Sequence, residues 1–213
     1  MTARVILLDP RNPSETALSE AAGLLRDGGI IAYPTETLYG LGVDGTNEAA
    51  VEKIFTVKGR SHSIPVSLII ASWSDLEQLA LNIPPAGRKL AEAFWPGGLT
   101  LLFTAAPAVS KKLTAGTGKI GVRFSSDPVA ALLARRLGRP ITATSANRSG
   151  GAECHNSQEV IAALGDRLDA VVDGGTTPGP PGSTIVDVTV DPPLVVREGV
   201  ISKSRLDAVL QGA

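Results

Sequence analysis

Five cationic side chains lie at or near the ends of expected helices and strands, beside turns that are rich in hydroxyl groups. These cations are Lys58, Arg60, Lys119, Arg123 and Arg197. Guanidinium and ammonium groups gathered in this way would bind an anionic ligand that carries several phosphates or carboxylates. For residues 58–60 (KGR), a helix C-terminus is an equally good interpretation, because cations and a following glycine are usual there.

Arg123 is expected in a buried strand, since it interrupts the apolar residues 120–124 (IGVRF). A guanidinium at such a position needs either an anion or a solvated cleft. Hydroxyl and amide groups flank other expected strands, in residues 33–42 (YPTETLYGLG), 144–147 (TSAN) and 182–184 (GST). Open α/β sheets bind their ligands at strand ends, so these segments form the candidate site.

Several other kinds of site are disfavoured. Residues 116–121 (GTGKIG) fit the dinucleotide pattern G-x-G-x-x-G, but a strand-like segment follows where that motif requires a helix. P-loop and G-x-S-x-G patterns do not occur. Two histidines and one cysteine supply no zinc site of ordinary spacing, and Cys154 and His155 are adjacent, which usually points side chains apart. No protein metal ligand is predicted.

The composition favours one domain, expected over residues 1–213. The 20 Lys and Arg residues are balanced by 21 Asp and Glu, which argues against a protein that works mainly as a basic nucleic-acid clamp. The sequence contains no run of about 18 apolar residues and no signal-peptide pattern, so no membrane association is expected. The single cysteine excludes an internal disulfide and is consistent with a cytoplasmic location.

Strand-like and helix-like segments alternate along most of the chain. The expected strands are 5–8, 29–33, 67–71, 99–104, 120–124, 141–144, 170–172, 185–190 and 194–197. Helices are expected after caps at Ser14, at Thr46 or Asn47, at Asp127, at Ser157, and at Ser202 or Ser204, with shorter helices over 74–80 and 85–95. The alternation indicates an α/β fold. Residues 191–193 are too few for a helical crossover, so the last two strands should be antiparallel, giving a twisted, open mixed sheet flanked by helices.

Taken together, the polar segments resemble the YrdC-type threonylcarbamoyl-AMP synthase family over about residues 14–199. The resemblance lies in the order and spacing of residues 33–42, 54–60, 95–100 (WPGGLT), 122–123, 145–150 (SANRSG), 183–185 (STI) and 197–199 (REG). It implies a YrdC-like sheet and a nucleotidyltransferase that condenses L-threonine, bicarbonate or CO2, and ATP into threonylcarbamoyl-AMP (L-threonylcarbamoyladenylate) and pyrophosphate, with Mg²⁺. Partner proteins would then transfer the threonylcarbamoyl group to adenosine 37 of tRNAs that read codons beginning with A.

The matching motif positions imply three groups of site residues. The catalytic group is Lys58, Arg60, Ser145 and Asn147; the ATP-binding group is Arg60, Lys119, Ser145, Asn147 and Arg197; the threonine-binding group is Thr37, Arg123 and Ser183. Arg123 would pair with the threonine carboxylate, because a guanidinium fork suits that geometry. Little covalent chemistry would fall to the protein, whose task would be to position substrates and to neutralise charge.

The sequence differs from the family pattern in two ways. After residues 58–60 the family commonly has a proline and then a lysine or asparagine before the next proline, whereas this chain has Ser61 and Ile64 before Pro65. One possible polar contact is thereby removed. Longer family members carry an additional C-terminal domain, so this chain resembles the short form, with a more open cleft.

Two other functions stay open. Related domains occur within larger carbamoyltransferases that form carbamoyl-adenylate; use of carbamoyl phosphate in place of threonine would favour that activity. The second is an RNA-binding module, because the family has a concave basic cleft. Balanced charge and only four phenylalanines argue against RNA binding as the main role, and weak RNA binding is kept as a secondary property.

Overall fold

The computed structural model of the protein describes residues 3–212. Within them, the strands form one ten-stranded sheet in the order β1-β8-β2-β3-β7-β4-β6-β5-β9-β10. In chain order the strands are β1 (Arg4–Leu7), β2 (Ile31–Pro34), β3 (Tyr39–Gly42), β4 (Ser67–Ile69), β5 (Leu99–Thr104), β6 (Lys119–Arg123), β7 (Ile141–Ser145), β8 (Ala170–Asp173), β9 (Thr184–Asp187) and β10 (Leu194–Arg197). The sheet combines parallel pairs, such as β1 with β8, with antiparallel pairs, such as β9 with β10. The expected mixed sheet, including the antiparallel pair at the end of the chain, is confirmed.

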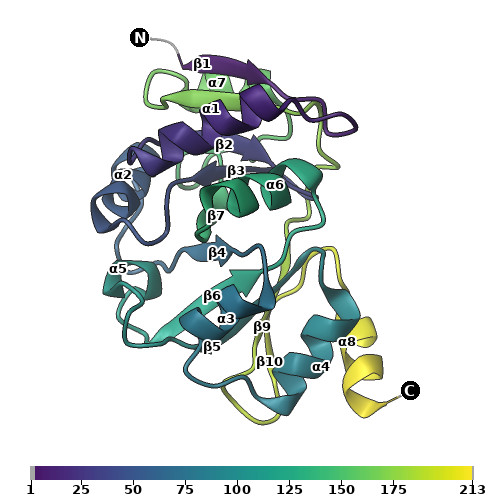
Figure 1. Ribbon diagram of the computed structural model, residues 1–213. Coiled ribbons are helices and arrows are strands. Elements are labelled where there is room, and N and C mark those ends of the chain that lie inside the picture. The colour runs from purple at the N-terminus through teal and green to yellow at the C-terminus, as the bar shows by residue number, and fades with distance from the viewer. Residues whose placement is uncertain (1–2, 213) are drawn as a thin grey trace.

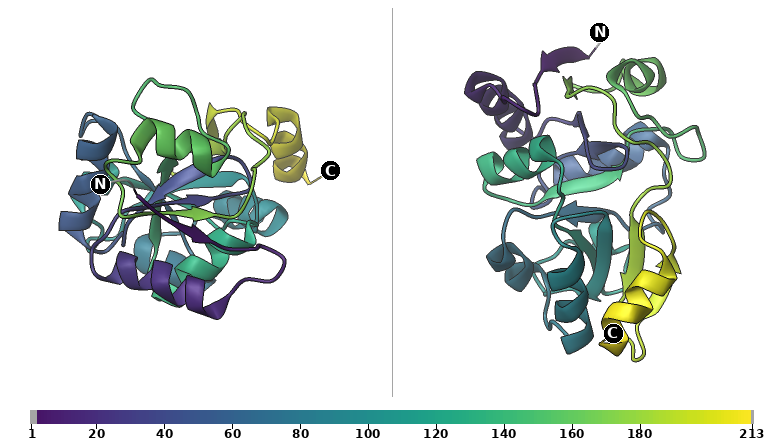
Figure 2. Two further views of the ribbon diagram at one scale, coloured as in Figure 1. Left: turned by 90° about the horizontal axis from the view of Figure 1, so that it is seen from above. Right: turned by 90° about the vertical axis from the view of Figure 1, so that its right-hand side faces the viewer.

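Helices cover both faces of this sheet (Figure 1). They are α1 (Glu15–Arg26), α2 (Glu48–Lys58), α3 (Trp73–Leu79), α4 (Pro85–Phe94), α5 (Lys111–Thr114), α6 (Pro128–Leu137), α7 (Ser157–Leu164) and α8 (Lys203–Gln211). Helix α1 packs against α6 on one face, whereas α7 packs on β8 from the other face, as the two further views in Figure 2 show. At the far end of the sheet, α4 packs against α8. Within residues 3–212, none of the helices combines the length and apolar character that crossing a bilayer requires.

Most helices begin at the residues whose side chains can satisfy free backbone N–H groups. Ser14, Asn47 and Asp127 each accept hydrogen bonds from the first turn of α1, α2 and α6 respectively, as expected. The expectation that Ser157 caps α7 is wrong. Asn156 is the cap, because its Oδ1 accepts the N–H three residues ahead, and Ser157 is the first helical residue.

Strand β3 was not expected, because its residues belong to the glycine-rich and hydroxyl-rich segment that the sequence marks as a turn. Gly40 and Gly42 point toward the ring of Tyr33 on the neighbouring strand β2. A Cβ atom on Gly42 would lie 2.7 Å from Tyr33 Cε1. Because these two glycines have no side chain, the buried ring of Tyr33 has room to lie across the β2–β3 pair. The short helix α5 was also not expected.

Two apolar clusters lie on opposite faces of the sheet. The larger contains the apolar faces of α2, α4 and α8, and the smaller lies beneath α1 and α6. The inner strands of the sheet are buried between these layers, so a charged side chain on them needs a partner of opposite charge or an opening to solvent. Arg123 on β6 is such a side chain, with 6% of its surface exposed.

Candidate active site

A recess opens on the sheet where the turn after β2 meets the ends of β7, β9 and β10. It contains about 770 Å³ of space free of protein atoms, counting the part that is open to solvent. Its lining residues are Thr35, Thr37, Leu38, Tyr39, Gly40, Arg60, Pro65, Ser67, Thr100, Arg123, Ala143, Thr144, Ser145, Glu153, Gly182, Ser183, Ile185 and Arg197. Three guanidinium groups and many hydroxyl groups therefore face one space.

The recess gathers most of the residues selected from the sequence. Those in its lining are Thr37, Arg60, Arg123, Ser145, Ser183 and Arg197. Lys58 and Asn147 contact this lining from behind, through the end of β7. Lys119 is not among the lining residues. The expected gathering of cations is thus seen for the three arginines.

The turn between β2 and β3 is held by the Thr35 hydroxyl. This Oγ1 donates to Leu38 O at 2.7 Å and accepts the N–H groups of Thr37 and Leu38, each at 3.3 Å. The hydroxyl groups of Thr35 and Thr37 lie 3.2 Å apart. These bonds fix the turn and present two buried hydroxyl groups to the recess.

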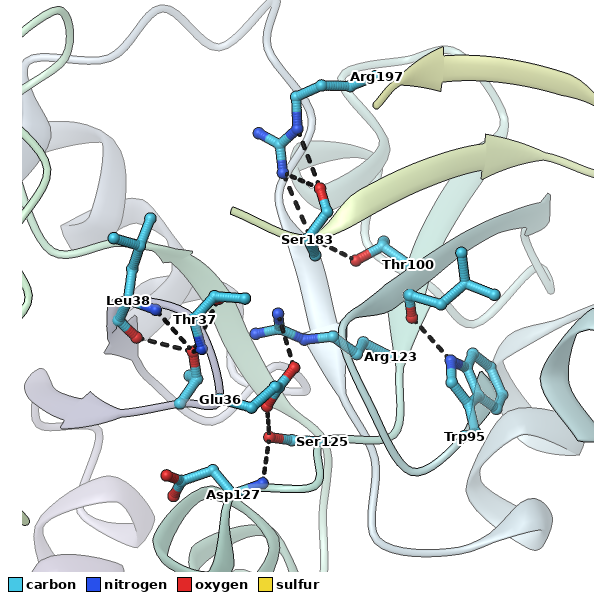
Figure 3. A network of polar contacts seen from close by, with 12 residues as sticks. Glu36, Thr37, Leu38, Trp95, Thr100, Arg123, Ser125, Asp127, Ser183 and Arg197 are labelled. Atoms are coloured by element: carbon cyan, nitrogen blue, oxygen red, sulfur yellow. Dashed lines mark hydrogen bonds and ion pairs between the residues drawn. The ribbon is translucent and has the colours of Figure 1, made fainter. Parts of the chain in front are cut away.

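Arg123 enters the recess from β6 and pairs with a carboxylate of that turn. Its Nη1 lies 3.1 Å from Oε1 of Glu36, and the Ser125 hydroxyl donates to the other oxygen of Glu36. Figure 3 shows the guanidinium between Thr37 and Ser183, with Glu36 on the side away from Ser183. Nearby Asp127 has its pKa raised to about 6, mainly by burial, with the charge of Glu36 adding to the shift.

Arg60 reaches the recess from the end of α2. Gly59 ends that helix in a left-handed conformation (φ 59°), so the interpretation of this glycine as a helix cap is confirmed. The Arg60 side chain then extends away from the helix, where Nη1 donates to Thr144 Oγ1 at 2.9 Å and Nη2 to Pro65 O at 2.7 Å. Burial lowers the pKa of Arg60, but an arginine at such a site stays charged.

Arg197 reaches the recess from the end of β10. It donates from Nε (3.2 Å) and Nη2 (2.7 Å) to the backbone oxygen of Ser183. The Ser183 hydroxyl lies 3.0 Å from Oγ1 of Thr100 on β5. The two hydroxyl groups form a small polar pair deep in the recess, beside Arg123 (Figure 3).

Lys58 is buried behind this lining, with 3% of its surface exposed. Its ammonium donates to the backbone oxygen of Ser145, to Asn147 O at 2.8 Å and to Asn147 Oδ1 at 3.1 Å. The Ser145 hydroxyl also donates to Asn147 Oδ1, at 2.6 Å. Burial, together with the charge of Arg60, lowers the pKa of Lys58 to about 8.

Lys119 has a separate partner at the start of β6. Its ammonium lies 2.6 Å from Oδ2 of Asp187 on β9. Burial would raise the pKa of Asp187, but hydrogen bonds from Lys119 and Thr189 outweigh it and lower that pKa. The glycine-rich loop before Lys119 leads directly into β6, so it lacks the following helix that a dinucleotide-binding motif needs.

Three polar residues of this region were not selected from the sequence. Glu36 pairs with Arg123, Thr100 pairs with Ser183, and Glu153 lines the recess between β7 and α7. One signal could have found Glu36: a buried arginine needs a counter-charge, and Glu36 is the acidic residue of the hydroxyl-rich turn. Thr100 ends the segment 95–100 that contributes to the family resemblance, but no local pattern gave it a role at the site.

Comparison with known families places this arrangement among related proteins. Residues 23–199 match the Sua5/YciO/YrdC family, whose description is "Telomere recombination". A Bacillus subtilis protein named threonylcarbamoyl-AMP synthase is 38% identical over 207 residues, which are 97% of this chain and 60% of that protein. A Pyrococcus abyssi protein of the same name is 37% identical over 190 residues, covering 89% of this chain and 56% of that protein. The chain therefore spans less than two thirds of these two relatives.

Two further matches cover almost the whole length of the related protein. One from Mycobacterium tuberculosis is 35% identical over 210 residues, covering 99% of this chain and 96% of its own. The structure of Escherichia coli YciO aligns with a TM-score of 0.87 at 26% identity, covering 96% of this chain and 99% of that chain. The structure of P. abyssi Sua5 complexed with L-threonine aligns with a TM-score of 0.93 at 36% identity, covering 96% of this chain and 60% of that chain. The family resemblance seen in the sequence is confirmed.

Proposed function

Because the chain belongs to the Sua5/YciO/YrdC family, we propose that it synthesises threonylcarbamoyl-AMP from L-threonine, bicarbonate or CO2, and ATP. The single observation that carries the proposal is the convergence of three arginines from α2, β6 and β10 on one hydroxyl-lined recess. One of these arginines is buried in the sheet, as a selective carboxylate site would require, and two lie nearer the rim, where a polyphosphate can enter. The names of the curated relatives support the same activity.

The reaction needs positioning more than covalent help from the protein. The neutral amine of threonine adds to CO2 and loses a proton, which gives a carbamate. A carbamate oxygen then attacks the α-phosphorus of ATP, and the bond from that phosphorus to the β-phosphate bridging oxygen breaks. Pyrophosphate leaves, and the products are threonylcarbamoyl-AMP and pyrophosphate.

In the proposed complex, the deep wall of the recess holds threonine. The free donors of Arg123 bind its carboxylate, and Thr37 contributes a hydroxyl from the fixed turn after β2. Ser183, paired with Thr100, faces the threonine side chain, whose hydroxyl suits this polar pair. An amino acid without a side-chain hydroxyl would leave both groups without a partner, which favours threonine.

ATP occupies the wider part of the recess. Arg60 and Arg197 bind its phosphates, since each guanidinium retains donors beyond its contacts with neutral oxygens. Ser145 lies at the end of β7 beside the reacting carbamate. Lys58 and Asn147 keep that strand end in place through the ammonium contacts behind it. Lys119 is the least supported of the ATP contacts, because Asp187 already holds it.

Mg²⁺ enters this proposal as part of the nucleotide. Within residues 3–212, no group of three or more His, Cys, Asp or Glu side chains is arranged to hold a metal ion. Glu153 is the carboxylate in the recess lining. Mg²⁺ commonly binds through phosphates, waters and one or two carboxylates, so this donor set fits a nucleotide-bound ion. The acid anhydride product is reactive, and partner proteins would pass its threonylcarbamoyl group to adenosine 37 of tRNA.

The direct test is release of pyrophosphate from ATP with defined omissions. We expect release to require both threonine and bicarbonate, and threonylcarbamoyl-AMP to appear in equal amount by mass spectrometry. Release that continues without threonine would overturn the proposal. So would AMP formation supported by carbamoyl phosphate in place of threonine, which would instead indicate a carbamoyltransferase.

A further inference from the structure

The three arginines of the recess differ in their counter-charges. Arg123 forms an ion pair with Glu36. Arg60 and Arg197 form none within residues 3–212, and their contacts are to hydroxyl and carbonyl oxygens. One end of the recess therefore carries an ion-paired guanidinium, whereas Arg60 and Arg197 have no ion-pair partner among the described residues and share the lining with one carboxylate, Glu153.

Glu36 is held in place on the side away from the recess. Its second oxygen accepts from the Ser125 hydroxyl, and Ser125 Oγ in turn accepts the N–H of Asp127 at 3.2 Å. Ser125 is fully buried, and Asp127 caps the first turn of α6. Glu36 is not among the residues that line the recess. The carboxylate is thus braced against a helix start and has little freedom to leave Arg123 (Figure 3).

Part of the Arg123 guanidinium is left without a partner. Its Nε is buried and has no hydrogen bond within the described residues, although the residue lines the recess. A buried N–H group without an acceptor is unfavourable, so a ligand oxygen at this position would relieve it. Glu36 Oε1, the oxygen nearest to Nη1, is also buried without a hydrogen bond in the described part of the chain, so the two groups are held together by charge, and this ion pair keeps the guanidinium beside Glu36.

We propose that Glu36 is a specificity-determining and positioning residue that orients the Arg123 guanidinium and cancels its charge, so that this end of the recess accepts a carboxylate and rejects phosphate. A carboxylate can be bound by the direction of the free N–H donors alone. Phosphate groups carry more negative charge and bind where positive charge is uncompensated, as at Arg60 and Arg197. This role of Glu36 rests on the proposed function, and it explains how one recess binds the amino acid at one end and the nucleotide phosphates at the other.

Glu36→Gln tests the charge, because glutamine keeps the shape of the side chain and an oxygen that can accept from Ser125, and removes the negative charge. Threonine binding is measured by calorimetric titration without nucleotide, with and without pyrophosphate. In the wild type we expect pyrophosphate to leave the threonine Kd unchanged. In Glu36→Gln we expect pyrophosphate to raise the threonine Kd about tenfold or more, which is the scale of one charge-assisted contact. Glu92→Gln, on the exposed surface of α4, is the matched control and should behave as the wild type.

Ser125→Ala tests the orientation of Glu36 separately, since it removes the hydrogen bond from the Ser125 hydroxyl and keeps the charge of Glu36. We expect it to raise the threonine Kd about tenfold without creating sensitivity to pyrophosphate, and to leave the KM for ATP within about twofold. This variant also keeps the inference testable if Glu36→Gln does not fold. A Glu36→Gln protein that folds with an unchanged response to pyrophosphate would overturn the inference alone. A wild type that neither binds threonine nor releases pyrophosphate would overturn the proposed function as well.

Discussion

The ammonium group of Lys58 lies 2.8 Å from the backbone oxygen of Asn147 and 3.1 Å from its side-chain oxygen Oδ1. A further contact to Ser145 O occupies the third donor. Lysine has three donors and no acceptor, so this ammonium is fully engaged with the loop after β7. In the free protein Lys58 thus positions other site residues, and it contacts a phosphate only by exchanging one of these bonds.

The first prediction concerns the contribution of this contact to catalysis. Lys58→Ala removes all three bonds and leaves Asn147 O without its donor, whereas Ser145 O still accepts the N–H of Asn147, so the loop that follows Ser145 should lose its position. We expect kcat/KM for pyrophosphate release to fall by on the order of 100-fold. Lys53→Ala is the control, because Lys53 lies on the same helix and also donates to a backbone oxygen, Gly28 O, away from the recess. Equal rates for the two variants would mean that Lys58 only ends helix α2 and does not position the site residues.

The second prediction concerns pH. Burial, then the charge of Arg60, lowers the pKa of Lys58 from 10.5 to about 8. Above pH 8 the amine loses its charge, so kcat/KM should fall with an apparent pKa near 8, and this limb should vanish in Lys58→Arg, which stays charged. Stability should move the other way. Between pH 8 and 10.5 the unfolded chain binds the proton that the folded chain has released, so this group favours the folded state more as pH rises.

These opposite trends separate catalysis from unfolding. Activity and thermal midpoint are to be measured on the same samples from pH 6.5 to about 9.5. A fall in activity that follows a fall in the thermal midpoint would contradict the assignment to Lys58, because the loss would then come from unfolding. So would a basic limb that persists unchanged in Lys58→Arg.

The third prediction concerns Gly199, which lies directly under the wall that carries Ser183. A Cβ atom at Gly199 would lie 2.1 Å from the backbone oxygen of Gly182. Because that contact is with backbone, Gly199→Ala must push Gly182 and Ser183 aside. We expect threonine turnover to fall by on the order of 100-fold, since shifts of about 1 Å at a reacting site have that effect.

A control for this substitution is available within α1. No atom lies within 4 Å of the position that a Cβ would take at Gly23. Gly23→Ala should therefore raise the free energy of unfolding by about 0.5–1 kcal/mol and leave turnover unchanged. If Gly199→Ala retained full turnover, the proposed role of Ser183 at the substrate would be wrong.

The fourth prediction concerns Lys119. Because its ammonium pairs with Asp187 away from the recess, Lys119→Met should leave the KM for ATP within about twofold. It should lower the free energy of unfolding by about 1 kcal/mol, since Asp187 keeps its bonds from Thr189. A large rise in KM for ATP at unchanged stability would restore Lys119 to the nucleotide site.

The sequence predicts individual elements better than their arrangement. Strand β5 and the pair β9–β10 could be predicted because apolar runs with clear breaks define them, and the caps at Ser14 and Asp127 because each has one strong local acceptor. Strand β3 could not, since its glycines serve the ring of Tyr33 on another strand. The order of the strands depends on pairings between remote segments, which no local pattern records.

The residues of the recess show the same difference between what a local sequence pattern predicts and what depends on contacts between remote segments. Arg123 could be selected because a guanidinium in an apolar strand conflicts with its surroundings. Its partner could not be derived from spacing, because Glu36 is 87 residues away along the chain and the pairing exists only once the sheet has formed. The family resemblance implied a catalytic role for Lys58, but its three bonds to Ser145 and Asn147 come from the fold alone.

The strand order also determines when the protein can begin to work during synthesis. Strand β8 (Ala170–Asp173) lies between β1 and β2 in the sheet. Strands β1 and β2 therefore lack this shared neighbour until residues 170–173 have been synthesised. Ser183 and Arg197 are contributed later still, by the segments around β9 and β10. A ribosome-bound chain that ends before these segments presents half a recess and an open sheet edge, which is prone to pairing with other chains. Synthesis must therefore pass β10 before the recess is complete, and folding that is dominated by long-range contacts is slow.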